Sequence, residues 1–235
     1  MPGLCRRLVL FDIDGTLITC RGRAGEALAR AMTATFGTPG PVETYRYSGK
    51  TDPQIVHELM AAAGLAREDV APRLSEVFES YLGTLESTLR GHASPLPGVE
   101  ELLAALAERD DVALGLLTGN IEPGARVKLR VTGLDRHFTF GAFGSDDEIR
   151  NNLVPVARAR ARAVWGDDFA GTRTVVVGDA EADVLCARAG GARAVAVASG
   201  WTDRAVLATL SPDALLDSLH PPGALAAILG DGSGS

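Results

Sequence analysis

The chain has few of the features that would point to a membrane, a disulfide framework or a nucleic-acid surface. Only 5% of its 235 residues are aromatic, and no stretch approaches the ~20 apolar residues that a membrane helix needs. Cys5, Cys20 and Cys186 show no paired spacing, which is typical of reduced thiols rather than of disulfides or a zinc site. With 30 acidic residues against 23 basic ones and no basic stripe, the chain is not expected to bind nucleic acid.

The first residues also lack the pattern of a secretory signal, because an apolar run follows Arg7 directly, without a cleavage site. We therefore expect a cytoplasmic protein. A hydrophobic content of 46% is enough for one sizeable domain with an inserted subdomain. Nothing in the sequence distinguishes a monomer from a homodimer.

Lysine is almost absent, since Lys50 and Lys128 are the only lysines among 23 basic residues. Arginine is the default cation of this chain, so a lysine that persists indicates a site that requires a compact ammonium. For Lys50 this interpretation competes evenly with that of an ordinary surface residue, and for Lys128 it is favoured.

Two apolar runs, each typical of a strand covered on both faces, end in aspartates. The first leads into Asp12 and Asp14, and the second leads into Asp179 and Asp183. In an open α/β sheet, ligands bind beyond the carboxyl ends of the strands. Because carboxylates concentrated there repel one another unless a cation lies among them, the pattern predicts a magnesium site beside a carboxylate nucleophile.

Strand patterns recur along the chain with helical patterns between them, which predicts a doubly wound parallel α/β sheet. The clear strands are predicted at 8–12, 112–117, 174–179 and 193–198, with weaker ones at 137–140 and 213–216.

Residues 19–93 break this alternation, because they show helical periodicity only. The helical patterns cover 24–36, 54–63 and 69–89. We expect an all-helical cap domain (19–93) inserted into a core domain made of residues 1–18 and 94–230, followed by a disordered tail at 231–235. An insertion after the first strand would lie over the crevice, where a lid belongs.

The residue types at the strand ends suit phosphoryl transfer. Asp12 is a candidate nucleophile, and Asp14, which precedes the tight turn at Gly15, is a candidate acid/base. An aspartate that merely caps the backbone of a turn is the structural alternative. At the end of the second strand, Thr118 and the backbone N–H groups around Gly119 could hold phosphate oxygens, although Thr118 could instead cap a turn.

These motifs resemble those of haloacid dehalogenase-superfamily phosphatases, in the phosphoglycolate-phosphatase-like branch with a helical cap. The likeness covers nearly the whole chain: residues 12–16 match the first motif, 118–120 the second and 178–183 the fourth.

The resemblance implies that Asp12 is the nucleophile and that Asp14 is the acid/base, whose backbone carbonyl also ligates Mg²⁺. It implies that Asp12 and Asp179 supply the carboxylates of the metal site, with Asp183 orienting the site. The substrate phosphate would be bound by Thr118 together with Gly15, Gly119 and Asn120.

The third motif departs from the family pattern. Relatives have a Lys-Pro pair before the fourth motif, and Arg150 occupies the expected place here. Lys128 lies among apolar helix positions, where a lysine is unusual unless its ammonium has an anionic partner. We therefore favour Lys128 as the cation that neutralises the nucleophile and the phosphate, over a lysine at the helix edge whose ammonium reaches water. Arg150 would share that role or pair with Asp146 or Asp147.

The loop at 47–52 is a polar break within the predicted cap. Its Lys50 could contact the non-phosphate end of a substrate, in particular a carboxylate. A solvated loop in which Thr51 or Asp52 begins the next helix is an equally good interpretation.

The sequence thus predicts a magnesium-dependent phosphomonoester hydrolase that forms an aspartyl-phosphate on a small, phosphoglycolate-like metabolite. Three alternatives remain open: a phosphomutase, a haloacid dehalogenase and a catalytically impaired phosphate-binding interaction protein. The presence of Asp14 counts against the dehalogenase, because that family has no acid at this position.

Overall fold

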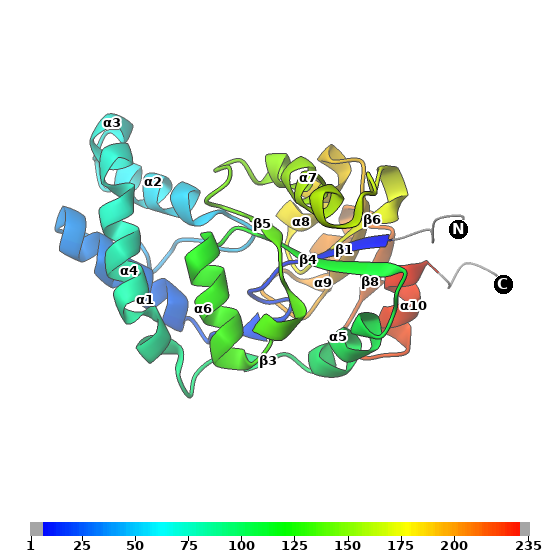
Figure 1. Ribbon diagram of the computed structural model, residues 1–235. Helices are drawn as coiled ribbons and strands as arrows, with labels where there is room; N and C mark the ends of the chain where they lie inside the picture. The colour runs from blue at the N-terminus through cyan, green and yellow to red at the C-terminus, as the bar shows by residue number, and fades with distance from the viewer. Residues whose placement is uncertain (1–6, 231–235) are drawn as a thin grey trace.

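The computed structural model describes residues 7–230, and within them a six-stranded parallel sheet forms the centre of the molecule. Its strand order is β5-β4-β1-β6-β7-β8, so the chain starts in the middle and winds outward both ways (Figure 1). The strands are β1 (Arg7–Phe11), β4 (Val112–Thr118), β5 (Gly141–Phe143), β6 (Thr174–Gly178), β7 (Arg193–Val197) and β8 (Ala214–Leu216). The doubly wound sheet is confirmed; the predicted tail at 231–235 lies outside the described residues.

Helices cover both faces of this sheet. Successive side chains of a strand point to opposite faces, and in these strands both sets are apolar and are buried under helices. Leu8 and Leu10 of β1 belong to one apolar cluster with residues of α7 and α8, whereas Val9 and Phe11 belong to another with α5 and α6. The core helices are α5 (Val99–Ala107), α6 (Glu122–Thr132), α7 (Leu153–Trp165), α8 (Glu181–Ala189), α9 (Arg204–Thr209) and α10 (Gly223–Leu229). Short 3-10 turns occupy Asp135–His137, Arg150–Asn152 and Gly171–Arg173. None of the helices in residues 7–230 combines the length and apolarity that a membrane crossing requires.

One strand lies elsewhere than predicted. The weak pattern at 137–140 is not a strand, and the ladder with β4 begins at Gly141. Phe138 and Phe140, which create that pattern, act as apolar anchors: Phe138 packs its edge against the ring of Phe11, and Phe140 lies over Gly115. The alternation of Phe138 and Phe140 therefore reflects two buried aromatic side chains and not a strand.

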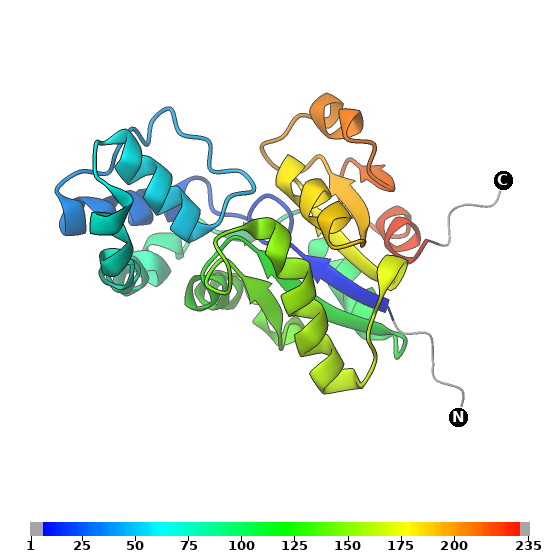
Figure 2. The same cartoon turned by 90° about the horizontal axis from the view of Figure 1, so that it is seen from above.

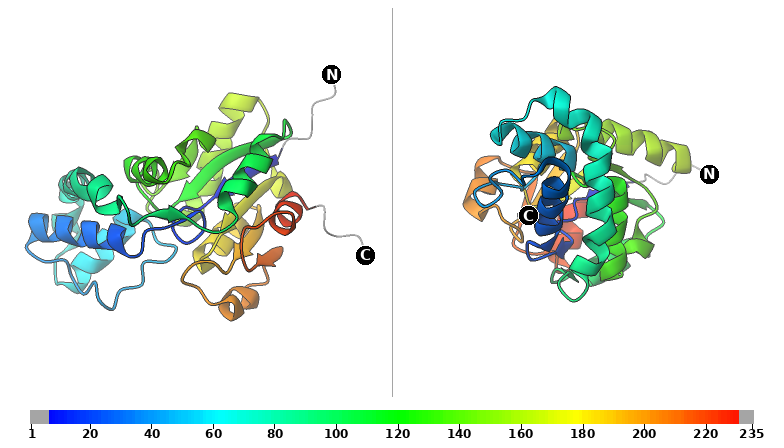
Figure 3. Two further views of the ribbon diagram at one scale, coloured as in Figure 1. Left: turned by 90° about the horizontal axis from the view of Figure 1, so that it is seen from below. Right: turned by 90° about the vertical axis from the view of Figure 1, so that its left-hand side faces the viewer.

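Residues 20–93, called the helical segment here, lie at the carboxyl end of the sheet (Figure 2 and left view of Figure 3). The chain enters and leaves this segment through β2 (Ile18–Thr19) and β3 (Ser94–Pro95), which pair antiparallel and were not predicted. Its helices are α1 (Arg23–Phe36), α2 (Asp52–Ala62), α3 (Arg67–Val70) and α4 (Leu74–Leu89), with a 3-10 turn at Ala71–Arg73. The pattern predicted as one helix over 69–89 is thus divided at Pro72, which cannot continue a helix without a break.

The helical segment packs closely onto the core through α4. Helix α4 lies beside α1 (right view of Figure 3) and also packs on α6 of the core. At this contact Gly124 of α6 faces α4, where a Cβ would make ordinary van der Waals contacts at 3.4 Å from the ring of Tyr81 and 3.9 Å from Leu85. One apolar cluster consequently runs from the sheet into the helical segment.

Candidate active site

Three buried carboxylates meet where the strands end. Asp12 follows β1, and Asp179 and Asp183 follow β6 around the start of α8. One ligand atom of each lies within 4.8 Å of the others. Burial raises the pKa of Asp12 to about 6 despite the charge of Arg150, and burial together with Asp12 and Asp183 raises the pKa of Asp179. Such a concentration of oxygen ligands is the chemistry that binds a hard divalent cation.

Asp179 lies in a close-fitting cradle of backbone. The hydroxyl of Thr16 donates to its Oδ1 at 3.0 Å, and the backbone N–H of Trp201 donates to Oδ2 at 3.3 Å. A Cβ on Gly15, whose φ is +86°, would lie 2.5 Å from Oδ2, and a Cβ on Gly200 would lie 1.7 Å from it. Gly15, predicted to touch the substrate, therefore makes room for Asp179 in the structure, and Gly200 does so from the opposite side. Sequence reasoning gave no role to Thr16, although it ends the first motif, and missed Gly200, which lies in no recognisable pattern.

Arg150 is the cation beside the candidate nucleophile. Its guanidinium nitrogen lies 3.1 Å from Oδ1 of Asp12 and 2.5 Å from Oδ1 of Asp183, and only 6% of the residue is exposed. Burial alone would lower the pKa of Arg150, but the charges of Asp183 and Asp12 raise it. The other oxygen of Asp183 accepts the N–H of Ala180 at 2.9 Å, so Asp183 fixes both the guanidinium and the start of α8.

The suggestion that Arg150 pairs with Asp146 or Asp147 is wrong. Asp146 forms its ion pair with Arg160 at 2.6 Å, and Asp147 accepts hydrogen bonds from Ile149 N–H and Asn152.

Lys128 has an anionic partner, as its apolar surroundings indicated, but that partner is Asp14 rather than Asp12. The ammonium lies 2.5 Å from Oδ2 of Asp14 and 2.5 Å from Oδ1 of Asn120, and Lys128 is 3% exposed. Burial by itself raises the pKa of Asp14, but Lys128, Asn120 and Cys20 outweigh it and hold that pKa below its ordinary value. The two candidate cations therefore serve two different aspartates.

Asn120 ties the second motif to Asp14. Its side-chain N–H₂ donates to Oδ2 of Asp14 and to the hydroxyl oxygen of Thr118, both at 2.8 Å. Thr118 ends β4 and is fully buried. Its oxygen also accepts the backbone N–H of Asn120 at 3.3 Å, so both bonds use Thr118 as an acceptor.

A loop of the helical segment lies directly on these residues, as Figure 2 shows for the connection before α2. A Cβ on Gly119 would lie 2.0 Å from the carbonyl oxygen of Lys50, and a Cβ on Gly49 would lie 2.6 Å from Ala182. Thr51 begins α2 as its N-cap, accepting from Gln54 N–H at 3.3 Å, which confirms the predicted capping. The prediction of a solvated loop is wrong, because Thr51 is fully buried and Asp52 is only 7% exposed. The ammonium of Lys50 points to Glu58 and to the hydroxyl of Tyr45 at 3.2 Å, not to Asp12.

Replacing Gly119 by alanine should separate this loop from the core, because the new Cβ would overlap the Lys50 carbonyl. A misplacement of about 1 Å costs on the order of 10²-fold in rate, so we expect a loss of that size in kcat/KM. Gly83→Ala is the matched control, since its Cβ would enter open space on α4. Steady-state kinetics of the two variants tests this, and equal rates would mean that the close contact has no part in catalysis.

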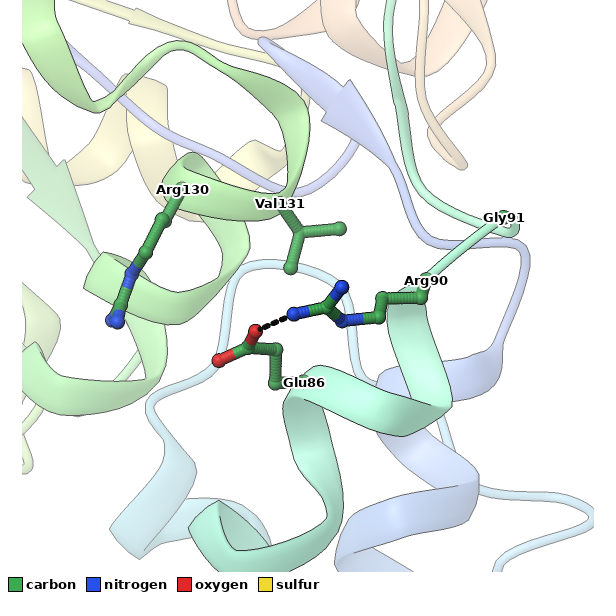
Figure 4. A pocket seen from close by; sticks show the side chains of 5 residues that line it. All are labelled: Glu86, Arg90, Gly91, Arg130 and Val131. Atoms are coloured by element: carbon green, nitrogen blue, oxygen red, sulfur yellow. Dashed lines mark hydrogen bonds and ion pairs between the residues drawn. The ribbon is translucent and has the colours of Figure 1, made fainter.

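Of two surface hollows on the described residues, one adjoins the site. One of about 400 Å³ lies between α4 and α6, lined by Arg90 and Arg130, with Glu86 bonded to Arg90 at 2.5 Å (Figure 4). It shares no residue with the carboxylates. The other, of about 630 Å³, lies between α2 and the segment before α7, and Arg150 is among its lining residues. The second hollow therefore extends from the site between the helical segment and the core.

Comparison with known proteins agrees with this geometry. A sequence model of the haloacid dehalogenase-like hydrolases matches residues 6–191. The plasmid phosphoglycolate phosphatase of Cupriavidus necator is 32% identical over 90% of this chain and 89% of its own length. The phosphoglycolate phosphatase of Pseudomonas fluorescens strain Pf0-1 is 29% identical over 95% of this chain and 82% of its own.

Solved structures share the fold. A protein from Haemophilus somnus described as a predicted phosphoglycolate phosphatase superimposes with a TM-score of 0.68 at 19% identity, covering 94% of this chain and 98% of its own. A predicted phosphatase from Clostridium acetobutylicum gives 0.72 at 15% identity, covering 96% and 99%. With the buried carboxylates and the matched motifs, these likenesses show that the chain belongs to the haloacid dehalogenase-like hydrolases, as an enzyme of the phosphoglycolate-phosphatase-like branch.

Proposed function

We propose that this enzyme is a magnesium-dependent phosphomonoester hydrolase that forms an aspartyl-phosphate on Asp12 and acts on a small phosphorylated carboxylic acid such as phosphoglycolate. One observation carries the proposal: Asp12 lies among buried carboxylates with a guanidinium at 3.1 Å, and a second aspartate with its own lysine lies two residues away. The names of the relatives support the choice of substrate.

The two aspartates divide the reaction. Because Lys128 keeps the pKa of Asp14 low, Asp14 first takes the proton of the monoanionic phosphate ester. A carboxylate oxygen of Asp12 then attacks phosphorus, the ester P–O bond breaks, and Asp14 passes that proton to the leaving oxygen. Water then attacks the phosphorus of the aspartyl-phosphate, Asp14 takes the proton of that water, and phosphate leaves. Arg150 balances charge at Asp12, and its buried Nε, which has no partner among residues 7–230, is a donor left for the substrate. The hydroxyl proton of Thr118 is free for a phosphoryl oxygen, because both of its bonds use the oxygen as acceptor.

The residues present fit a magnesium ion. Asp12 and Asp179 would supply the carboxylates. The resemblance to the family assigns the backbone carbonyl of Asp14 as a further ligand. Both oxygens of Asp183 are engaged, by Arg150 and by the N–H of Ala180, so we assign Asp183 to orienting the site. A bound magnesium ion stabilises negative charge on the phosphoryl oxygens.

We further propose that the helical segment is a cap over this site. Asp12 is 6% exposed, Thr118 is not exposed, and a loop of the helical segment lies on Gly119, so movement of the cap would widen access to them. Lys50, whose ammonium lies beside Glu58 at the larger hollow, is our candidate for the carboxylate end of the substrate. The buried free thiols of Cys20 and Cys186 support a reducing compartment, the cytoplasm.

Activity should vanish with EDTA and return with Mg²⁺, because the site is built from hard oxygen ligands. Asp179→Ala should raise the Mg²⁺ concentration needed for half-maximal activity more than any change of an exposed carboxylate. Asp203→Ala, at an exposed aspartate, is the matched control. Phosphate release from phosphoglycolate across a Mg²⁺ titration measures both effects. Phosphate release that persists in EDTA would show that hydrolysis does not require a divalent cation and would contradict the proposed metal site.

A further inference from the structure

Asp52, the first residue of α2, makes a two-sided contact between the helical segment and the second motif. Its backbone N–H donates to the carbonyl oxygen of Gly119 at 2.7 Å. Its carboxylate Oδ2 accepts the backbone N–H of Ile121 at 2.8 Å. The two hydrogen bonds therefore hold the backbone of Gly119 and of Ile121, the residues on either side of Asn120.

Asn120 is the residue that holds the candidate acid/base. Its side chain donates to Asp14 and to Thr118 and accepts from Lys128, so its orientation positions all three polar groups. A shift of the backbone at Asn120 would be transmitted to Asp14 through a hydrogen bond of 2.8 Å. Asp52 itself does not lie among the carboxylates that could hold a metal.

Asp52 is buried, so the loss of its hydrogen bonds would not be compensated by water. It is 7% exposed, and burial raises its pKa to about 6 in spite of Lys128 and the Ile121 N–H, with Asp14 raising it further. A buried carboxylate is costly unless it is hydrogen-bonded, so the Ile121 N–H is needed to offset the cost of burying Asp52. A residue chosen only to begin a helix would not need a buried carboxylate, because Thr51 already supplies the cap.

We propose that Asp52 is a positioning residue that clamps the backbone on both sides of Asn120 when the helical segment closes, and thereby sets Asp14 for proton transfer. The inference rests on the proposed function, because it assigns Asp14 to the leaving group. Closure of the helical segment and assembly of the acid/base are then one event, linked by two hydrogen bonds.

The kinetic test compares two phosphate esters. Asp52→Ala should lower kcat for phosphoglycolate, an alkyl ester that needs a proton donor, about tenfold more than for p-nitrophenyl phosphate, whose leaving group departs as a stable anion. Asp52→Asn keeps an oxygen that can accept from Ile121 N–H, so it should behave much more like the unmodified enzyme. Glu86→Ala, which removes a half-buried carboxylate of the helical segment that pairs with Arg90, is the control and should change neither rate.

The second arm needs no turnover. Hydrogen exchange of the peptide that contains Ile121 should be faster in Asp52→Ala and unchanged in Asp52→Asn and Glu86→Ala. Should Asp52→Ala not fold, Asp52→Ser, whose hydroxyl is too short to reach Ile121, takes its place in both arms. If the enzyme hydrolyses neither ester, the proposed function fails, and the exchange experiment still tests the clamp.

Three results would overturn the inference. Equal losses on both esters would show that Asp52 supports the fold without acting on Asp14. Unchanged exchange at Ile121 in the truncated variants, or an Asp52→Asn variant as impaired as Asp52→Ala, would show that the hydrogen bond to Ile121 is not what matters.

Discussion

Replacing Asp12 by asparagine is expected to reduce phosphate release to the background rate while leaving the fold intact. An amide cannot form the aspartyl-phosphate, so the first chemical step has no nucleophile. The amide oxygen can still accept from Arg150, which now lies 3.1 Å from Oδ1. Because Asp12 is a buried carboxylate whose pKa is raised to about 6, its neutral replacement should be tolerated, with an unchanged or higher melting temperature.

The measurement is single-turnover phosphate release together with thermal unfolding. Asp14→Asn is the informative comparison, because loss of an acid/base costs about 10²–10⁴-fold rather than everything. The exposed Asp203→Asn is the control for the substitution itself. An Asp12→Asn variant that keeps a near-normal rate would exclude the covalent mechanism.

The convergence of Asp12 and Asp179 could be predicted because parallel strands end at one edge of a sheet. The continuous apolar runs of β1 and β6 fix where these strands end, and the aspartates follow directly. That inference needs only local pattern and the general geometry of α/β sheets. The same is true of the helical segment, whose periodic faces are visible without any tertiary contact.

The partners of the two cations could not be predicted in this way. Lys128 and Arg150 are 22 positions apart, and which aspartate each reaches depends on how α6 and the turn before α7 pack on the sheet. An apolar neighbourhood shows that Lys128 needs an anion, but it does not say which one. The contact of Asp52 with Ile121 depends on the docking of the helical segment and is likewise absent from any local pattern.

Arg150→Ala and Lys128→Ala should both be severely impaired, in ways that distinguish their positions. If Lys128 served the nucleophile, as we favoured from the sequence, Lys128→Ala would lose far more activity than Arg150→Ala. With Arg150 beside Asp12, we now expect Arg150→Ala to lower kcat about 10²–10³-fold on every phosphate ester, because charge at the nucleophile matters for all of them. Lys128→Ala, which frees Asp14, should cost about 10²–10⁴-fold on alkyl esters and much less on p-nitrophenyl phosphate.

The conservative exchanges sharpen this prediction. Arg150→Lys should recover only part of the activity, because one ammonium cannot reproduce a planar guanidinium that contacts both Asp12 and Asp183. Lys128→Arg should not recover full activity either, since the ammonium is fitted between Asp14 and Asn120 in a site with 3% exposure. Arg160→Ala, which breaks the more exposed pair with Asp146, is the control for loss of an arginine. The opposite result would be near-normal activity of Arg150→Ala and severe loss in Lys128→Ala on both esters. It would show that Lys128 is the cation of the nucleophile and that the contact between Arg150 and Asp12 is structural only.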